Sequence, residues 1–551
     1  MPVLAGLRDL APRRGDYAGL RRSWPRDLAA GVTVAVVALP LALAFGVATG
    51  VGAAPGLVTA VVAGTVAALL GGSHLQVTGP TGAMTVVLVP LVADHGPAVV
   101  YPLALLAGVL VVAAAVLRLG RLLGYVPWPL IEGFTLGIAV VIAAQQVPSA
   151  LGVDRPEKDN AAVGAVLAVA DFLRHPRWVV VALLLLAVVL TAGLSRLHRA
   201  VPASLIAVVV VTVVTEVSGL RVAVIGELPA ALPAPALPDL SGLGALLGPA
   251  VAVAFLAALE SLLSARVADG MSDADRSDPD RELLGQGLAN VASGLCGGMP
   301  ATGAIARTAV NARAGARTRI AALTHALVLG AVVYTASGLV GRIPLVALAG
   351  VLLVTAYRMV ERHTVRAVLA STPGDALVFA STALATVALD LVAAVAIGMA
   401  LAVVVSVVRL AGTARAVPEP VRAPEVDDDV EQALLDRHVL AYRLDGPLFF
   451  GAVTRFVTEV TATADVRVVI LRLAGVGLLD ASGARALGEI VDVLESRGMT
   501  VLVKGATGEH RRLLEAVGTL RPLLDRGHVF DDLPGAVTHA LHHVARPATV
   551  P

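Results

Sequence analysis

The stretch GPTGAM, residues 79–84, interrupts one of the most apolar regions of this chain. Its last four residues, Thr81-Gly82-Ala83-Met84, have a near copy in MPATGAI, residues 299–305, as Thr302-Gly303-Ala304-Ile305. A proline and a pair of glycines precede each copy. Because glycine and proline interrupt helices, the chain is predicted to break twice, at matching places in its two halves.

The composition is that of a membrane protein. Of the 551 residues, 57% are hydrophobic and 15% are charged, against about 25% charged in ordinary soluble domains. About fourteen apolar segments recur, most of them near the roughly 20 residues that span a bilayer. The predicted segments are 27–48, 55–71, 79–93, 98–117, 127–147, 177–195, 200–217, 246–267, 283–297, 302–314, 319–340, 343–357, 375–389 and 391–409.

Charge and cysteine content exclude two other classes. A net charge of +1 gives no signal for a nucleic-acid partner. The single cysteine excludes a disulfide framework.

The placement of arginine predicts how the chain is threaded and divided. With fourteen spans, every short basic loop falls on the side of the N-terminus, so both termini are predicted to be cytoplasmic. Residues 1–24 form a basic lead-in without a signal-peptide pattern. The membrane part is predicted for 25–411, a polar, proline-rich linker for 412–436, and a soluble α/β domain for 437–545.

The two halves of the membrane part are predicted to be inverted repeats. Residues 1–217 and about 240–410 hold seven segments each. Because seven is odd, the second half starts on the opposite side of the membrane from the first. Many secondary transporters share this arrangement, with broken helices that meet near the membrane midplane.

The broken helices predict an anion site. Their N-termini offer unpaired N–H groups and positive dipole ends. Gly82 and Gly303 allow close backbone approach, and the hydroxyls of Thr81 and Thr302 are expected to cap a helix or contact the ligand. The alternative is that both breaks are tight packing kinks without a ligand.

Two side chains are predicted to complete the anion site. Arg307 lies about one turn into the tenth segment and could hold the anion electrostatically. Alternatively, it makes a structural salt bridge or bonds to backbone carbonyls. Phe45, in LPLALAFG of the first segment, is expected either to wall the site or simply to pack.

An acidic residue inside the membrane predicts ion coupling. Glu260 lies deep in the eighth segment, where a carboxylate is costly and usually functional. Ser264 lies one turn later on the same face. The pair is predicted to bind a co-transported cation, or Glu260 to carry a proton. The alternative is that Glu260 is a fixed partner of Arg307.

Four stretches, in this order, resemble the SulP family, the sulfate-permease and multifunctional anion exchanger group. They are DLAAGVTVAVVALPLALAFGVATG (27–50), LLGGSHLQVTGPTGAM (69–84), ALESLLSARVADGM (258–271) and ELLGQGLANVASGLCGGMPATGAIARTAVNARAG (282–315). The resemblance implies a 7+7 inverted-repeat fold with core and gate domains, a homodimer and an elevator-like movement.

The same resemblance implies where the anion lies, between the starts of segments three and ten. The residues implied to approach it, mainly through the backbone, are Thr81, Gly82, Ala83, Thr302, Gly303, Ala304 and Ile305. The family has a hydroxyl residue where this chain has Ile305, so only the backbone contact carries over at that position.

The coupling ion stays open between Na⁺ and H⁺. Segments eight to ten most closely resemble sodium-dependent bicarbonate transporters of the cyanobacterial type, in which an acid and a hydroxyl one turn later bind Na⁺. Glu260 and Ser264 match that pair. Those transporters tend to have Asp at this place, and a Glu is found in members thought to couple to protons.

The C-terminal domain resembles a STAS domain. Its LLDASGARAL stretch (478–487) resembles the loop with a phosphorylatable Ser in anti-anti-sigma factors, and the match falls on Ser482. A Ser at a helix start after Asp480 is also an ordinary N-cap arrangement. Alternatively, the resemblance implies a domain that binds nucleotides or protein partners, and both alternatives stay open.

The prediction is therefore a multi-pass secondary active transporter in the bacterial plasma (inner) membrane. It is expected to move bicarbonate or sulfate with Na⁺ or H⁺ by alternating access. No enzymatic activity and no cofactor are expected. The alternatives are a dicarboxylate or nucleobase permease on the same fold, a membrane-anchored STAS signalling protein that has lost transport, and an uncoupled channel-like pathway.

Overall fold

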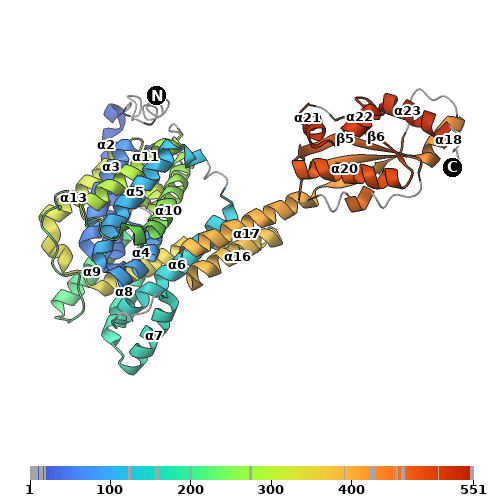
Figure 1. Cartoon of the computed structure of the whole chain (residues 1–551). Coiled ribbons are helices and arrows are strands. Elements are labelled where there is room, and N and C mark those ends of the chain that lie inside the picture. The colour runs from blue at the N-terminus through green and yellow to red at the C-terminus, as the bar shows by residue number, and fades with distance from the viewer. Residues whose placement is uncertain are drawn as a thin grey trace. The chain divides into compact units, whose positions relative to one another are not determined.

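The computed structural model describes most of the chain (Figure 1). The described residues are 10, 17, 20–121, 126–154, 160–197, 201–271, 276–389, 391–421, 429–450, 452, 457–460, 466–506 and 508–545. The chain divides into two compact units, Met1–Ala400 and Leu401–Pro551. Each unit has hydrophobic clusters of its own.

All fourteen predicted apolar segments are helices. Those of the first half are α2 (Leu20–Ala48), α3 (Ala53–Leu70), α4 (Gly82–His95), α5 (Val100–Val116), α6 (Trp128–Leu151), α8 (Trp178–Leu197) and α9 (Ala203–Val217). Those of the second half are α10 (Leu243–Gly270), α11 (Pro279–Leu295), α12 (Ile305–Arg313), α13 (Ile320–Gly341), α14 (Leu345–Met359), α16 (Pro373–Ala388) and α17 (Leu391–Gly412). In the described part, eight helical stretches are long and apolar enough to cross a membrane, and α4, α9 and α16 are shorter apolar helices. The fold is the predicted polytopic helical architecture.

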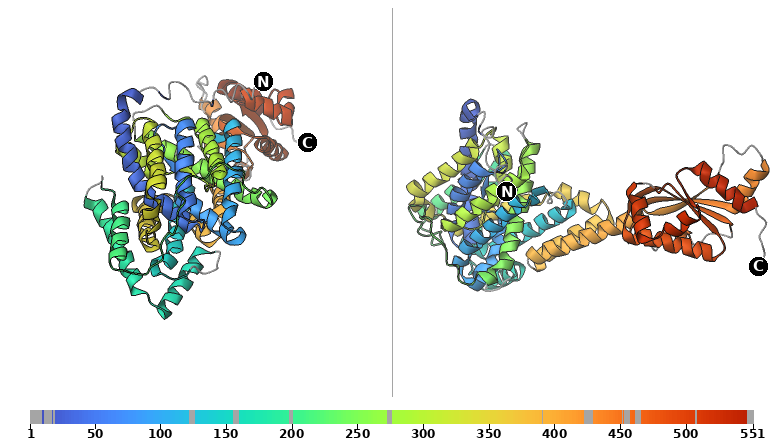
Figure 2. Two further views of the ribbon diagram at one scale, coloured as in Figure 1. Left: turned by 90° about the vertical axis from the view of Figure 1, so that its left-hand side faces the viewer. Right: turned by 45° about the horizontal axis from the view of Figure 1, so that its top comes forward.

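The helices pack in two groups that follow the repeat. The core group contains α2, α3, α4 and α5 together with α10, α11, α12 and α13. The gate group contains α6, α8 and α9 together with α14 and α16. Each half thus gives its first four helices to the core group and later ones to the gate group. Figures 1 and 2 show α5 and α11 lying side by side in the core group.

Glycines let α5 and α11 approach closely. A Cβ on Gly108 would lie 2.6 Å from the backbone nitrogen of Val291, and one on Gly287 would lie 2.7 Å from that of Val112. Small residues at such crossings are typical of membrane helices, which gain van der Waals packing when their backbones come near. Larger side chains here would push α11 away from the core group.

Two short helices were not predicted. Helix α7 (Ala161–Arg174) lies in the long connection after α6, and α15 (Arg362–Leu369) follows α14. Asn160 caps α7, because its side-chain oxygen accepts from the N–H groups of Ala162 and Val163. Its amide also donates to the carbonyl of Val387 at 3.1 Å, which ties α7 to α16. Helix α15 is short and polar, and α7, with 14 residues, is shorter than the roughly 20 residues that span a bilayer.

The two segments that interrupt the helices, called the breaks here, pair with each other. Strand β1 (Thr78–Gly79) and strand β2 (Thr302–Gly303) are antiparallel, with Thr78 opposite Gly303 and Gly79 opposite Thr302. The N–H of Ala304 extends the pairing by donating to the carbonyl of Val77 at 2.9 Å. Backbone pairing satisfies polar groups that a broken helix would otherwise leave unpaired inside the membrane. It also brings the starts of α4 and α12 together.

The C-terminal unit is an α/β domain, as predicted. Its sheet has the order β3-β4-β5-β6-β7, antiparallel between β3 and β4 and parallel elsewhere. The strands are β3 (Arg415–Glu419), β4 (Val439–Leu448), β5 (Val468–Leu479), β6 (Thr500–Lys504) and β7 (Val529–Phe530). The helices are α18 (Asp429–His438), α20 (Ala481–Ser496), α21 (Gly508–Val517), α22 (Arg521–Asp525) and α23 (Leu533–Ala545). One hydrophobic cluster lies between the sheet and α20, α21 and α22, and another between the sheet and α18 and α23. Helices on both sides of the sheet are visible in Figure 2.

Part of the predicted linker is a strand. Residues 415–419, placed in the 412–436 linker, form β3 and pair with β4. Pro418 lies in this strand, and its proline-rich surroundings favoured a linker. An edge strand tolerates proline because only one of its sides is hydrogen-bonded.

Candidate functional site

The site is built where α4 and α12 begin. Thr81 occupies the N-cap position of α4 and Ala304 that of α12, and neither makes a side-chain cap hydrogen bond. Of the two roles expected for the threonine hydroxyls, helix capping is not observed, and contact with a ligand stays a prediction. The first N–H groups of both helices, side by side through β1 and β2, remain without a side-chain cap among the described residues. Such helix starts favour negative charge.

Both threonine hydroxyls bond to Glu260 instead. The hydroxyl of Thr81 donates to Glu260 Oε2 at 2.9 Å, and that of Thr302 donates to the same oxygen at 2.6 Å. The equivalent threonines of the two repeats therefore converge on one carboxylate of α10. A hydroxyl has one proton to donate, so neither threonine can donate to another ligand in this arrangement.

Ser264 lies beside the site but bonds elsewhere. Its hydroxyl pairs with the Thr308 hydroxyl of α12 at 2.9 Å, and Thr308 Oγ1 also accepts from the Val77 N–H at 3.1 Å. The neighbouring Ser261 hydroxyl accepts from the Gly303 N–H at 3.0 Å. Serine hydroxyls on one face of α10 thus hold Gly303 directly and the backbone of Val77 through Thr308. The role of Ser264 as a cation ligand stays a prediction.

Arg307 lies beneath the breaks with an incomplete set of partners. It is 2% exposed, and one terminal nitrogen donates to the carbonyl of Pro80, the last residue before Thr81. The other, Nη1, has no hydrogen-bond partner among the described residues. Nη1 lies close under β1, since a Cβ on Gly79 would be 2.6 Å from it.

No ion pair of Arg307 is found among the described residues. Of the two alternatives, the bond to a backbone carbonyl is the one observed, and no ion pair within 4.0 Å joins Arg307 to Glu260. The two charges still attract each other at longer range, but a buried N–H group without an acceptor is costly. The position therefore favours an anion close to Nη1 and the helix starts.

The remaining predicted residues lie at the same place. Phe45 of α2 is buried against Gly82, where an added Cβ would be 3.4 Å from Phe45 Cε1 and 2.2 Å from Ile142 Cδ1. Ala83 is buried too. Ile305, the first residue of α12, is 41% exposed and gives the site an open side.

Gln76 was missed by the sequence reasoning. It is 6% exposed, and neither atom of its side-chain amide has a hydrogen-bond partner among the described residues. It lies against β2, because a Cβ on Gly303 would be only 1.9 Å from Gln76 Nε2. A buried amide without partners is costly, so Gln76 is a further candidate for ligand contact. Its only signal in the sequence is a polar residue in the stretch just before GPTGAM.

A polar stripe on α11 holds both breaks and was also missed. Gln286 Nε2 donates to the Thr78 hydroxyl at 2.6 Å and to Glu282 Oε1 at 3.0 Å. Asn290 donates to the carbonyl of Ala301 at 2.9 Å and accepts from its N–H at 2.8 Å. The residues are spaced four apart and so lie on one helix face. That spacing, in ELLGQGLANVAS, is the signal that could have found them.

A large cavity lies between the core and gate groups. Its volume is about 1480 Å³, and α2, α8, α12 and α14 line it. Arg196, Arg313 and Arg358 lie at the ends of three of these helices and give the cavity a basic wall, so we call it the arginine vestibule. All three come from loops predicted to share one side of the membrane, and the common cavity agrees with that sidedness. Exposed residues of α12 lie at its two ends, Ile305 and Ala306 at the start and Arg313 at the end.

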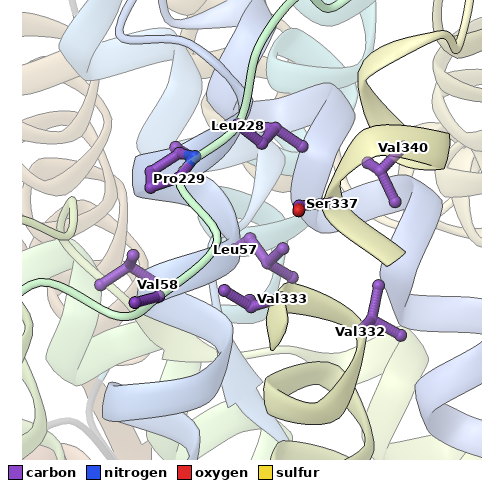
Figure 3. Close-up of a pocket in the computed structure, with 10 residues that line it drawn as sticks. Leu57, Val58, Leu228, Pro229, Val332, Val333, Ser337 and Val340 are labelled. Atoms are coloured by element: carbon purple, nitrogen blue, oxygen red, sulfur yellow. The ribbon is translucent and has the colours of Figure 1, made fainter. Parts of the chain in front are cut away.

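A second hollow, drawn in Figure 3, is apolar. Leu57 and Val58 of α3, Leu228 and Pro229, and Val332, Val333 and Val340 of α13 line it, with Ser337 as a polar residue. No charged residue lines it. An anion would find no counter-charge there.

Ser482 belongs to the C-terminal unit. It is exposed in the first turn of α20. The N-cap is Asp480, whose side chain accepts from the Gly483 N–H at 2.7 Å. Capping therefore belongs to Asp480, and the Ser482 hydroxyl is open to modification by its position.

Comparison with known proteins finds a family match for each of the two units. Residues 25–382 match the model of the Sulfate permease family, and residues 432–536 match that of the STAS domain. The chain is 33% identical to the "Putative sulfate transporter YvdB" of Bacillus subtilis, over 93% of this chain and 96% of the relative. It is 32% identical to the "Bicarbonate transporter BicA" of Synechocystis sp., over 94% of this chain and 95% of the relative.

Two solved structures share the fold. The transmembrane domain of a cyanobacterium bicarbonate transporter, BicA, has a TM-score of 0.62 and 32% identity, covering 68% of this chain and 98% of that one. SLC26A9 has a TM-score of 0.82 over 98% of this chain and 92% of that one. Its identity is 18%, so this likeness concerns the fold alone.

Proposed function

This chain belongs to the Sulfate permease family of membrane anion transporters, and we propose that it is a secondary active transporter of bicarbonate or sulfate. The single observation that carries the proposal is Arg307, buried beside two uncapped helix starts with Nη1 free of any described partner. A small anion would satisfy the guanidinium and the helix N–H groups at once. The names of its relatives, one a sulfate and one a bicarbonate transporter, support these two substrates.

Glu260 would couple the anion to a cation. As a carboxylate it draws the Thr81 and Thr302 hydroxyls toward itself and repels an anion at the helix starts. A proton or Na⁺ at Glu260 would remove the repulsion and free both hydroxyls to donate to the anion. Loading of the cation and of the anion would then favour each other, which is the condition for symport.

Alternating access would move the core group against the gate group. The arginine vestibule lies between these groups and would attract anions from one side of the membrane. By the arginine rule, that side is the cytoplasm, where both termini would also lie. The membrane would be the bacterial plasma membrane, the working form a homodimer, and the STAS unit a site for a protein or nucleotide partner.

The test is uptake by the purified full chain in proteoliposomes. Radiolabelled bicarbonate, at alkaline pH to limit loss as carbon dioxide, and radiolabelled sulfate are measured with an inward Na⁺ gradient, an inward H⁺ gradient or neither. We expect one of them to accumulate under one gradient. Arg307→Gln should abolish uptake and Glu260→Gln should abolish its dependence on the gradient.

Arg342→Gln is the matched control, because Arg342 is exposed at the end of α13 and does not line the arginine vestibule. It should retain most uptake. Accumulation of neither anion under any gradient would refute the proposal, as would equal loss in Arg307→Gln and Arg342→Gln. Strong competition by fumarate would point to a dicarboxylate permease instead.

A further inference from the structure

Three histidines gather at one edge of the STAS unit. His528 precedes β7, and His539 and His543 lie one turn apart on α23. Their ring centroids are 5.0–5.5 Å apart, and candidate ligand nitrogens of all three lie within 4.8 Å of one another. Nothing in the transport site involves them.

The backbone around the cluster is fixed. Ala536, Val537, Ala540 and Val544 are buried on the inner face of α23. His528 is anchored by its own backbone, since its N–H donates to Leu523 and its carbonyl accepts from the Val503 N–H. The three rings are thus held at their positions by the sheet and by the packing of α23.

His528 presents a nitrogen to the cluster. The ring bonds to the backbone of Val501, while the buried Nδ1 has no hydrogen-bond partner among the described residues. An imidazole whose other nitrogen bonds to a backbone group is the usual form of a metal ligand.

The spacing of the other two rings fits a metal ion. His539 Nε2 and His543 Nε2 are 3.2 Å apart. Two nitrogens about 2.0–2.1 Å from one tetrahedral ion are separated by a little over 3 Å. Histidines at i and i+4 on one helix are a common metal-binding pair. Both rings are half-buried, so a fourth position could face the solvent.

We propose that His528, His539 and His543 bind a divalent transition metal ion such as Zn²⁺. Three imidazoles suit Zn²⁺, Cu²⁺ or Ni²⁺ rather than the hard ions Na⁺ or Mg²⁺. The ion would join α23 to the segment before β7 and so fasten the last described helix to the sheet. A cluster of packed neutral rings without affinity for metal is the alternative that the experiment excludes.

The experiment uses full-length protein in detergent, purified without a histidine tag and freed of metal with a chelator. Co²⁺ is titrated while its visible absorption is followed, and Zn²⁺ is then added in competition. We expect one saturable site per chain with the spectrum of a nitrogen-ligated ion, displaced by Zn²⁺. His539→Ala and His543→Ala should each weaken binding by at least about 100-fold, since even loss of a supporting partner costs about 10–100-fold.

His542→Ala is the matched control, because His542 is exposed on the same helix between the two ligands. It should bind Co²⁺ like the parent chain. Equal weakening by His542→Ala, or no saturable site in the parent chain, overturns the proposal. Circular dichroism of each variant confirms folding, and His528→Gln should lose metal binding while it keeps the fold.

Discussion

The convergence of Thr81 and Thr302 on one oxygen of Glu260 leads to a sharp prediction for Thr302→Val. Valine keeps the branched shape of threonine but removes the hydroxyl that donates to Glu260 Oε2 at 2.6 Å. That bond stabilises the carboxylate without its coupling ion, so its loss should tighten binding of the coupling ion. The expected direction is a gain in affinity from the removal of a polar group.

The size of the effect follows from the strength of the bond. A hydrogen bond to a charged group contributes about 1.5–3 kcal/mol, and about 1.4 kcal/mol is a factor of ten. The concentration of Na⁺ or H⁺ that half-saturates uptake should therefore fall by roughly 10- to 150-fold. The lower end is expected because Thr81 still donates to the same oxygen. Thr81→Val, with a bond of 2.9 Å, should give a smaller shift.

The assay is the initial rate of anion uptake in proteoliposomes against the concentration of the coupling ion. Thr302→Ser keeps the hydroxyl and serves as the control, with a half-saturation value close to that of the parent chain. A higher half-saturation concentration in Thr302→Val would refute the reasoning. It would mean that the hydroxyl binds the coupling ion directly rather than competing with it.

Three further predictions concern the breaks and the STAS unit. Gly303→Ala should lower the free energy of unfolding by about 1–3 kcal/mol and abolish uptake, because its Cβ would lie 1.9 Å from Gln76 Nε2. Thermal unfolding in detergent measures the loss. Adding Gln76→Ala should restore part of the stability, and no recovery in the double variant contradicts the clash. Asn290→Ala leaves the buried N–H and carbonyl of Ala301 without their hydrogen-bond partner. At about 1–3 kcal/mol for each group, the free energy of unfolding should fall by about 2–4 kcal/mol in the same assay. An unchanged unfolding temperature contradicts the role given to α11. Ser482→Asp puts a negative charge in the first turn of α20 and should stabilise the STAS unit by about 0.3–1 kcal/mol. The gain should appear as slower limited proteolysis, and Ser482→Lys should give the opposite change. Faster cleavage of the Asp variant contradicts this prediction.

Much of the fold could be predicted because it depends on local composition. Apolar runs long enough to span a bilayer give the fourteen helices, and alternating apolar residues give β4, β5 and β6. The elements that were missed lack such a local signature. Helix α7 is short and carries polar residues, and β3 contains Pro418 and is a strand only through its pairing with β4.

The sequence by itself determined the class of the protein and the meeting of the two interrupted helices, because the repeated TGA stretches mark two helix starts and seven segments per half bring them together. Only the tertiary structure decided which side chains meet there. Thr81 and Thr302 share one Glu260 oxygen, Ser264 bonds to Thr308, and Arg307 Nη1 has no hydrogen-bond partner among the described residues. The physical reason is that hydrophobic pattern is a local property of the chain. A hydrogen bond of about 3 Å between residues tens to hundreds of positions apart depends on how the helices are rotated and shifted against each other, which only their packing sets.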